Sequence, residues 1–278
     1  MSSMSSRRAL TMVGIWFAAA MIFAAGLFYF RDTTMGMEFL TCYLIEWTLS
    51  IDNLFVFLLI FQTFGVDQHR QLRALQWGII GAIVMRLIFI SLGVALVTVF
   101  EPVLYIFGVV LIYSAYKMLG SEMETIDFKQ NKLVKLIRRW IPITHDFIGD
   151  KFFVKHKDGL MATPMLLVLV AIESSDLMFA VDSIPAAFAI SKHPMIIFSA
   201  NIFAILGLRS LYFLLAHADK MFVYLRYGIA LVLSFVGVKM LINHYYKINI
   251  YVSLVIVIGT LIFSIFASWL KARSEKSR

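Results

Sequence analysis

The sequence predicts an all-α membrane protein with about eight transmembrane helices, six of which form an inverted repeat of two three-helix units. Three observations support this fold class. Of the 278 residues, 61% are hydrophobic and only 15% are charged, whereas a soluble domain has about 25% charged residues. The apolar residues gather in runs of roughly 20, the length that crosses a bilayer as a helix. Once these runs are counted as spans, most lysines and arginines fall on one side of the membrane.

The composition also excludes several function classes. A chain with so few polar residues cannot cover a water-facing surface, so we do not expect a soluble enzyme. Its single cysteine, Cys42, cannot form an intrachain disulfide, which excludes a disulfide-stapled domain. The net charge of +8 belongs to no folded basic domain, so we expect no nucleic-acid partner. The sequence also contains no Walker A motif for binding ATP phosphates.

The expected spans follow one another with turn or charge signals between them. In order along the chain they are 10–30, 38–64, 75–100, 102–120, 160–190, 194–216, 222–243 and 248–270. The first run follows Arg7 and Arg8 and so resembles a signal peptide. Because the run is long enough to cross the bilayer, we expect an uncleaved first helix.

These spans divide the chain into five parts. Residues 1–36 hold the first membrane helix, 37–120 the first three-helix unit, 121–159 a basic cytoplasmic loop, 160–243 the second three-helix unit, and 244–278 the last helix with a cytoplasmic tail. With the N-terminus inside, 18 lysines and arginines lie in cytoplasmic segments and three, Arg31, Lys192 and Lys247, lie outside. The positive-inside rule therefore predicts a multi-pass protein with both termini in the cytoplasm and the lipid bilayer as its surroundings.

Five acidic residues fall within the expected spans: Glu46, Asp52, Glu173, Asp176 and Asp182. An ionised carboxylate at mid-bilayer costs about 2.5–3.5 kcal/mol, so these groups need partners. Two deep arginines, Arg86 and Arg209, are natural partners for structural charge pairing. Two cations do not balance five acids, and the sequence therefore predicts bound protons or a bound metal cation.

The spacing of the polar residues favours a cation site. Glu46, Ser50 and Asn53 are four and three residues apart, which places their oxygen atoms on one helix face. Pro185 frees the carbonyl of Val181, which lies beside Asp182. Carboxylate, amide, hydroxyl and carbonyl oxygens favour Mg²⁺, Ca²⁺ or Mn²⁺, whereas zinc and copper sites use thiolate or imidazole. All six histidines lie at span ends or in loops.

The two acid-bearing spans begin similar segments. The motif at 50–53 (SIDN) parallels that at 180–183 (AVDS), and each is followed by an arginine, 34 and 27 residues after the motif aspartate, and then by a lysine. The two units start on opposite sides of the membrane. Three-helix units of opposite orientation are typical of alternating-access transporters, which bind their substrate between the repeats.

Three segments of the sequence resemble the TerC family of integral membrane proteins, in particular its Alx-like branch. They are residues 43–53 (YLIEWTLSIDN), 173–186 (ESSDLMFAVDSIPA) and 199–213 (SANIFAILGLRSLYF). The resemblance implies a secondary transporter that exports Mn²⁺ across the bacterial inner membrane, with a historical link to tellurite resistance. It implies no permanent cofactor, Mn²⁺ as the transported ion, and metal binding by Glu46, Asp52, Asn53, Glu173, Asp176, Asp182 and Ser183. Counter-transport of protons would supply the energy.

Two other functions stay open from the sequence. The chain could deliver metal to the secretion machinery or to exported enzymes, and such a protein would have the same metal site. The chain could also be an intramembrane aspartyl protease that uses Asp52 and Asp182 as a dyad. The second function leaves three membrane acids unused and lacks the glycine-rich flank of such aspartates. Carboxylate-lined helices repel an oxyanion, so we expect any effect on tellurite to be indirect.

Overall fold

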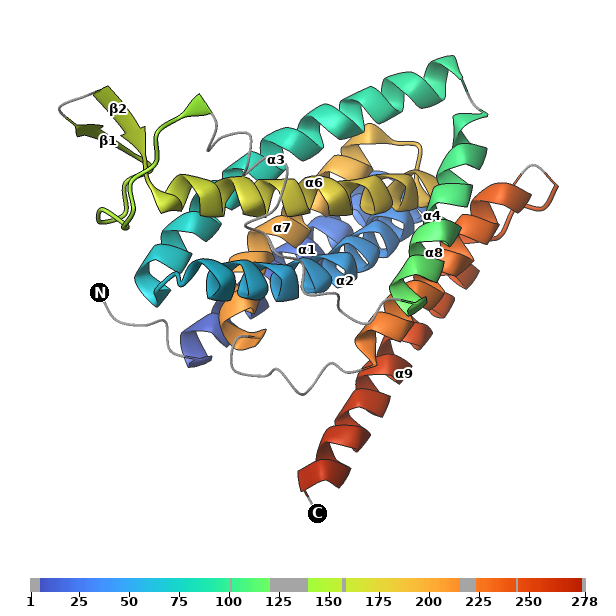
Figure 1. The fold of residues 1–278 in the computed structure, drawn as a ribbon. Coiled ribbons are helices and arrows are strands. Elements are labelled where there is room, and N and C mark those ends of the chain that lie inside the picture. The colour runs from blue at the N-terminus through green and yellow to red at the C-terminus, as the bar shows by residue number, and fades with distance from the viewer. Residues whose placement is uncertain are drawn as a thin grey trace.

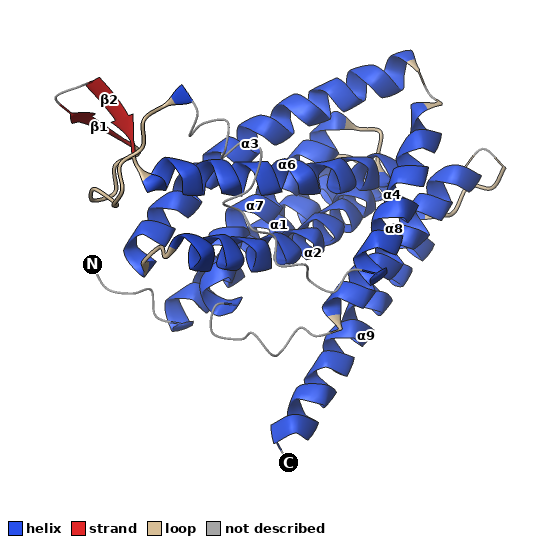
Figure 2. Ribbon diagram, viewed as in Figure 1, coloured by secondary structure: helices blue, strands red, loops and turns tan. Residues whose placement is uncertain are grey.

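The structure is a computed structural model, and it describes residues 6–100, 102–120, 140–156, 159–215, 224–243 and 245–276. Helices make up nearly all of this part of the chain (Figures 1 and 2). The helices are α1 (Ser6–Phe30), α2 (Thr33–Phe64), α3 (Gln68–Val99), α4 (Val103–Gly120), α6 (Pro164–Ile190), α7 (Pro194–Leu215), α8 (Leu225–Ile242) and α9 (Ile250–Lys276). Two short strands, β1 (Phe153–His156) and β2 (Gly159–Ala162), precede α6.

The turn signals of the sequence become helix caps. The carboxylate of Asp32 accepts a hydrogen bond of 2.7 Å from the backbone N–H of Met35 and so begins α2. Asp67 begins α3 in the same way, with a bond of 2.9 Å from the N–H of Arg70. Between them, Gly65 ends α2 with φ of 63°, a left-handed conformation that favours glycine. These caps join α1, α2 and α3 through very short turns.

The segment before α6 differs from the expectation. Strands β1 and β2, residues 153–156 and 159–162, pair in antiparallel orientation, with Phe153 opposite Ala162 and His156 opposite Gly159. The helix expected from residue 160 therefore begins at Pro164, where Thr163 caps it and proline fits the first turn, which needs no N–H donor. The apolar residues of β2 continued the hydrophobic run of α6, and this made the run longer than the helix. The remainder of the expected basic loop, residues 121–139, lies outside the described residues.

Helix α2 forms the centre of the bundle. In its most apolar stretch 69% of the residues are buried, against 17% in α1 and 22% in α3. Helices α1, α6, α7 and α9 pack against it. Helix α3 lies on α6 and α7, while α4 pairs with α8 at the side of the bundle from which α9 extends (Figure 1).

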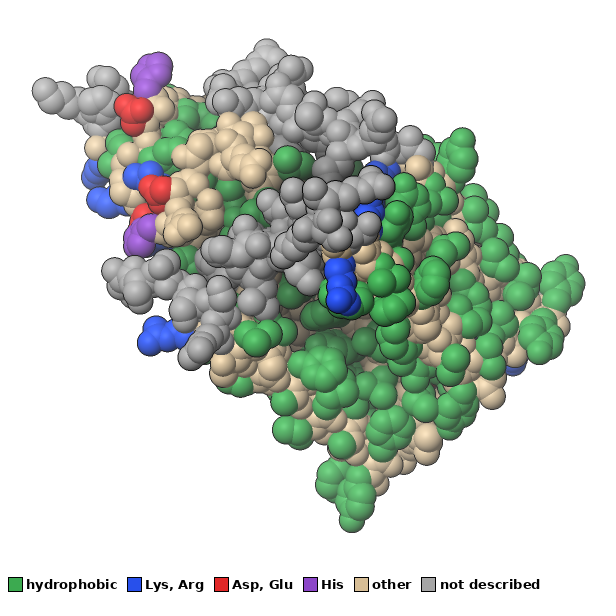
Figure 3. All heavy atoms as spheres, turned by 90° about the horizontal axis from the view of Figure 1, so that it is seen from below, with side chains coloured by type: hydrophobic (Ala, Val, Ile, Leu, Met, Phe, Trp, Pro, Cys, Tyr) green, Lys and Arg blue, Asp and Glu red, His purple; other side chains and the backbone are tan. Residues whose placement is uncertain are grey.

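The outer surface is that of a membrane protein. Six helices, α1, α2, α3, α6, α8 and α9, are long and apolar enough to cross a bilayer, and shorter apolar stretches occupy Val103–Leu119 in α4 and Pro194–Leu208 in α7. Large apolar side chains such as Leu92, Ile262 and Phe263 are exposed, as expected of helices that face lipid. Figure 3 shows green apolar side chains over most of one face of the molecule, while acidic and histidine side chains gather at one corner. The prediction of a helical, multi-pass membrane protein is confirmed.

Helix α6 continues through Pro185 to Ile190 without interruption. Proline has no N–H to donate, so the carbonyl of Val181 loses its usual partner within the helix. This oxygen lies next to Asp182 in the chain, as the sequence predicts. The helix is therefore locally weakened at this point although it is not unwound.

Candidate cation site in the buried polar core

The centre of the bundle contains a small group of buried charged and polar side chains. Glu46 of α2 is 1% exposed, Arg86 of α3 is 2% exposed and Asp176 of α6 is 3% exposed. The guanidinium of Arg86 donates a hydrogen bond of 2.5 Å to Glu46 Oε2 and lies 3.6 Å from Asp176 Oδ1. The amide of Asn53, which is fully buried, donates to the same Asp176 oxygen over 3.2 Å. We call Glu46, Asn53, Arg86 and Asp176 the polar core.

Helix periodicity explains how the polar core forms. Glu46 and Asn53 are seven residues apart on α2 and face the same neighbour, and Ser50 lies between them on that face. All three are buried. Because α6 packs against both α2 and α3, Asp176 reaches the α2 side chains and Arg86 at once.

The charges of the polar core do not balance, since two carboxylates surround one guanidinium. Several buried oxygens on α2 and α6 also have no hydrogen-bond partner among the described residues. They are Glu46 Oε1, Ser50 Oγ, Asn53 Oδ1, Asp176 Oδ2 and Ser183 Oγ. A buried polar atom without a partner costs about 1–3 kcal/mol. Among the described residues, these unpaired oxygens gather in one helix pair beside one unpaired donor, Arg86 Nε. Carboxylate, amide and hydroxyl oxygens can accept hydrogen bonds or act as ligands of a cation.

Two further candidate acids of α6, Glu173 and Asp182, are not members of the polar core. Glu173 is half-buried against α3, where Gly81 leaves room for its carboxylate, and a Cβ atom at Gly81 would overlap the carboxylate oxygens. Asp182 is also half-buried and accepts a hydrogen bond of 2.5 Å from Ser114 Oγ of α4. Glu173 and Asp176 thus both face α3, where they lie against Gly81 and Arg86, whereas Asp182 faces α4.

The remaining candidates have less complete descriptions. The backbones of Asp52 and Arg209 lie in α2 and α7, but their side chains are outside the described residues. Ser183 is fully buried, seven residues after Asp176 on the same face of α6. Among the described side chains, no three Asp, Glu, His or Cys groups come together as a metal-ligand set. The polar core supplies two carboxylates and one neutral amide oxygen, that of Asn53.

Two residues of this region were not among the sequence candidates. Asn201 of α7 is 2% exposed, and its Nδ2 has no partner among the described residues. A lone amide in an apolar helix was the signal that could have identified Asn201. Ser114 gave no such signal, because hydroxyl residues are common in membrane helices and usually bond their own backbone.

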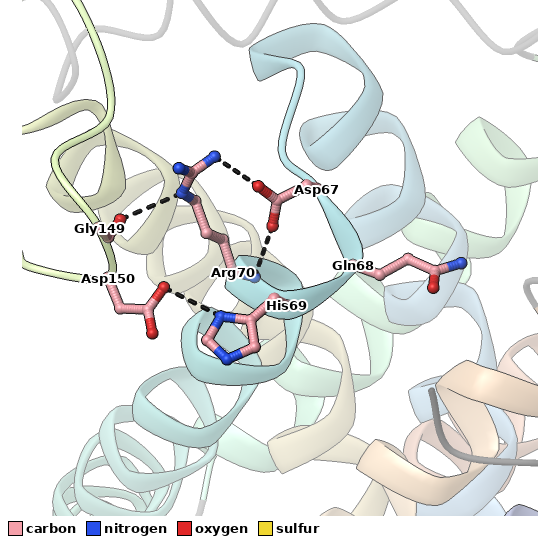
Figure 4. A pocket seen from close by; sticks show the side chains of 6 residues that line it. All are labelled: Asp67, Gln68, His69, Arg70, Gly149 and Asp150. Carbon is pink, nitrogen blue, oxygen red and sulfur yellow. Dashed lines mark hydrogen bonds and ion pairs between the residues drawn. The ribbon is translucent and has the colours of Figure 1, made fainter. Parts of the chain in front are cut away.

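A wide, exposed pocket of about 530 Å³ lies away from the polar core, between the start of α3 and the segment before the hairpin (Figure 4). Arg70 Nε donates to the carbonyl of Gly149 over 3.1 Å, and His69 Nδ1 lies 3.2 Å from Asp150 Oδ1. Arg70 also forms an ion pair with Asp67. These exposed contacts hold residues 149–150 against the α2–α3 turn, and we refer to them as the surface clasp.

Comparison with known proteins gives consistent results. The sequence model of the integral membrane protein TerC family matches residues 31–276. An uncharacterised membrane protein of Myxococcus xanthus is 42% identical over 267 residues, which is 96% of this chain and 84% of that protein. A membrane protein of Rickettsia bellii is 42% identical over 265 residues, or 95% and 88% of the two chains.

A third relative has a functional name. The "putative membrane-bound redox modulator Alx" of Escherichia coli is 40% identical over 285 aligned positions, which cover 99% of this chain and 89% of that protein. No solved structure matches this chain.

Proposed function

Since this chain belongs to the TerC family of integral membrane proteins, we propose that it is a secondary transporter of divalent metal cations. The expected substrate is Mn²⁺, exported across the bacterial inner membrane in exchange for protons. The observation that carries the proposal is the set of unpaired buried oxygens beside Glu46 and Asp176. Carboxylate, amide and hydroxyl oxygens are ligands for hard divalent cations.

Arg86 has a defined part in this proposal. Its guanidinium lies between Glu46 and Asp176, the position that an entering divalent cation would take. A buried pair of carboxylates without a cation would repel each other strongly. Arg86 would therefore compensate the site while it is empty and give way when the metal binds. Glu46, Asn53 and Asp176 would supply the first metal ligands, with Ser50 and Ser183 close on the same helix faces.

The packing of the helices supports an inverted repeat. If α2, α3 and α4 correspond to α6, α7 and α8, then the α2–α7 contact corresponds to the α3–α6 contact, and both are extensive. Each of the pairs α2–α6, α3–α7 and α4–α8 joins a helix to its own counterpart in the other unit, and all three pairs are in contact. These contacts agree with the pseudo-two-fold axis that an inverted repeat would have. The polar core takes its residues from α2, α3 and α6, so in the proposed repeat it would lie between the two units, where such transporters bind their substrate.

The contacts at the two ends of the bundle support eight membrane crossings. At one end Arg70 bonds Gly149, and Arg226 bonds the carbonyl of Met118. At the other end Ser191 donates to Glu38 over 2.6 Å. In each contact, the charge distribution assigns both segments to the same side of the membrane. The contacts of Arg70 and Arg226 would lie on the cytoplasmic side, and that of Ser191 on the opposite side.

The name of the Alx relatives raises a redox role as an alternative. Cys42 is the single cysteine of this chain, and it is fully buried between α2 and α6, with its Sγ 3.8 Å from the carbonyl of Ala187. One cysteine cannot form an intrachain dithiol pair. The residues therefore favour cation transport over thiol redox chemistry.

Transport by purified protein in vesicles tests the proposal. We expect wild-type protein to move Mn²⁺ across the bilayer. The flux should be faster when a proton gradient drives protons in the direction opposite to that of Mn²⁺. Glu46→Gln and Asp176→Asn should each lower Mn²⁺ affinity by roughly tenfold or more, which corresponds to about 1.4 kcal/mol. Asp146→Asn is the matched control, because Asp146 is exposed and takes part in none of the hydrogen bonds and ion pairs of the polar core.

The same assay separates transport from metal delivery. Flux in vesicles that contain no other protein supports transport. Mn²⁺ binding without any flux would reject transport and favour delivery to a partner protein.

A further inference from the structure

A second pocket, of about 400 Å³, lies at the end of the bundle where α2, α4 and α9 begin and α6 and α8 end. Its charged lining consists of Glu38, Lys192, Lys239 and Lys247, with His193 beside them. We call it the lysine pocket. Three lysines and one glutamate give it a positive formal charge even when His193 is neutral. It shares no residue with the polar core.

Lys239 is the unusual member of this pocket. Its side chain is 7% exposed, and its ammonium donates a hydrogen bond of 3.0 Å to the neutral hydroxyl of Ser253 on α9. No ion pair joins Lys239 to a carboxylate of the described residues. The carboxylate of Glu38 instead accepts a hydrogen bond from Ser191.

A buried ammonium is normally paired, because removing it from water is costly. The negative end of the α8 helix dipole favours a cation in the last turn, where Lys239 lies, but this effect is smaller than the cost of burial. Snorkelling, which would bring the ammonium to water, does not fit a side chain that is 93% buried. The ammonium has three N–H donors, and Ser253 takes one of them.

We propose that the lysine pocket binds a phosphate-bearing anion, which completes the charge balance of Lys239. Lys192 and Lys247 are exposed at the pocket's edge and supply the further positive charge that a phosphate requires. The rest of the lining is largely apolar and includes Leu104, Phe188 and Met240. The anion can be free phosphate or the phosphodiester of a lipid headgroup, since both present the same oxygens to the lysines.

Thermal unfolding of the full-length protein in a neutral detergent tests this site. One series adds inorganic phosphate at constant ionic strength, with chloride as the balancing anion. A second series adds mixed micelles that contain phosphatidylglycerol, with phosphatidylcholine as the neutral comparison. We expect the phosphate group to raise the unfolding midpoint by several degrees. A rise with phosphatidylglycerol alone identifies a lipid headgroup, and a rise with inorganic phosphate as well identifies a general phosphate site.

Three variants connect the effect to the pocket. Lys239→Met removes the buried charge, so it should raise the midpoint without anion and abolish the gain from phosphate. If that variant fails to insert into the membrane, the double variant Lys192→Gln/Lys247→Gln replaces two exposed lysines instead. It should raise the anion concentration that gives half of the maximal gain about tenfold. Lys155→Gln, at an exposed position on β1, should leave the gain unchanged. An equal gain in wild type and the pocket variants, or no gain with either additive, overturns the proposal.

Discussion

Arg86 is a fully buried cation in the middle of an apolar bundle, where it forms a hydrogen-bonded ion pair with Glu46 and a longer ion pair with Asp176. Taking a guanidinium and two carboxylates out of water is costly, and their mutual attraction offsets much of that cost. The balance depends on all three groups being present. Removing the arginine leaves Glu46 and Asp176 as two unpaired buried acids.

We therefore predict that Arg86→Met destabilises the protein by about 3–5 kcal/mol, the usual effect of breaking a buried ion pair. Thermal unfolding in detergent measures this loss. Arg73→Gln serves as the control, because Arg73 is 47% exposed and its nearest carboxylate oxygen, on Asp150, is 4.0 Å away. Added Mn²⁺ should restore part of the stability of Arg86→Met, since a divalent cation can take the vacated position. A loss no larger than that of Arg73→Gln would contradict the pairing.

A second prediction at this scale concerns Asp182. Ser114→Ala removes the hydroxyl that donates to its carboxylate, and a hydrogen bond to a charged group contributes about 1.5–3 kcal/mol. Ser174→Ala is the matched control, because Ser174 bonds only the carbonyl of Val170 in its own helix among the described residues. The unfolding midpoint of Ser114→Ala should fall clearly below that of Ser174→Ala. Equal midpoints would mean that the Ser114–Asp182 bond adds no stability.

At the scale of elements, α4 and α8 approach each other closely at a pair of glycines. A Cβ atom at Gly108 would lie 3.0 Å from the backbone oxygen of Gly237, and one at Gly237 would lie 2.9 Å from the oxygen of Gly108. Small residues allow two membrane helices to pack backbone to backbone, where dispersion forces are strongest. In the proposed inverted repeat, this crossing would join the last helices of the two three-helix units.

Gly237→Val should separate α4 from α8 and destabilise the protein by about 1–3 kcal/mol, the usual cost of overpacking. Gly207→Ala on α7 is the control, because a Cβ atom there meets nothing within 4 Å. That control should be neutral or stabilising by about 0.5–1 kcal/mol, since alanine favours a helix over glycine. Thermal unfolding compares the two. Similar midpoints for both variants would exclude close packing at the crossing.

At the scale of the whole molecule, the charge pattern predicts opposite sides for the hairpin and for the turn between α8 and α9. We expect Lys155→Cys to be labelled from the cytoplasm and Lys247→Cys from the opposite side, each in a Cys42→Ala background. Both lysines are exposed, so a membrane-impermeant thiol reagent can reach them. Labelling of both from the same side would reject an odd number of membrane crossings between them.

The sequence predicts the helices well because apolar runs and capping residues are local signals. Asp32 and Asp67 are turn signals of the sequence, and they cap α2 and α3. These helices begin at Thr33 and Gln68, earlier than the expected residues 38 and 75. The hairpin was not predicted, because the apolar residues of β2 directly precede α6 and were included in the expected membrane helix. Helical spacing also predicted the shared face of Glu46 and Asn53, which depends on one helix alone.

Other features of the site depend on distant parts of the chain. The bond from Ser114 to Asp182 joins residues 68 positions apart, and the room that Gly81 leaves for Glu173 depends on how α3 crosses α6. No local pattern specifies such pairings. They follow from the packing angles of whole helices, which a single sequence does not reveal.

The surface clasp has a mechanical consequence. It joins the start of α3 to the segment that leads into α6. Helices α3 and α6, which meet in the polar core, are therefore also connected at the protein surface. Each exposed ion pair in it contributes only about 0–1 kcal/mol, comparable with thermal energy. The clasp therefore holds the α2–α3 turn to the segment before α6 only weakly, and thermal motion is enough to release it.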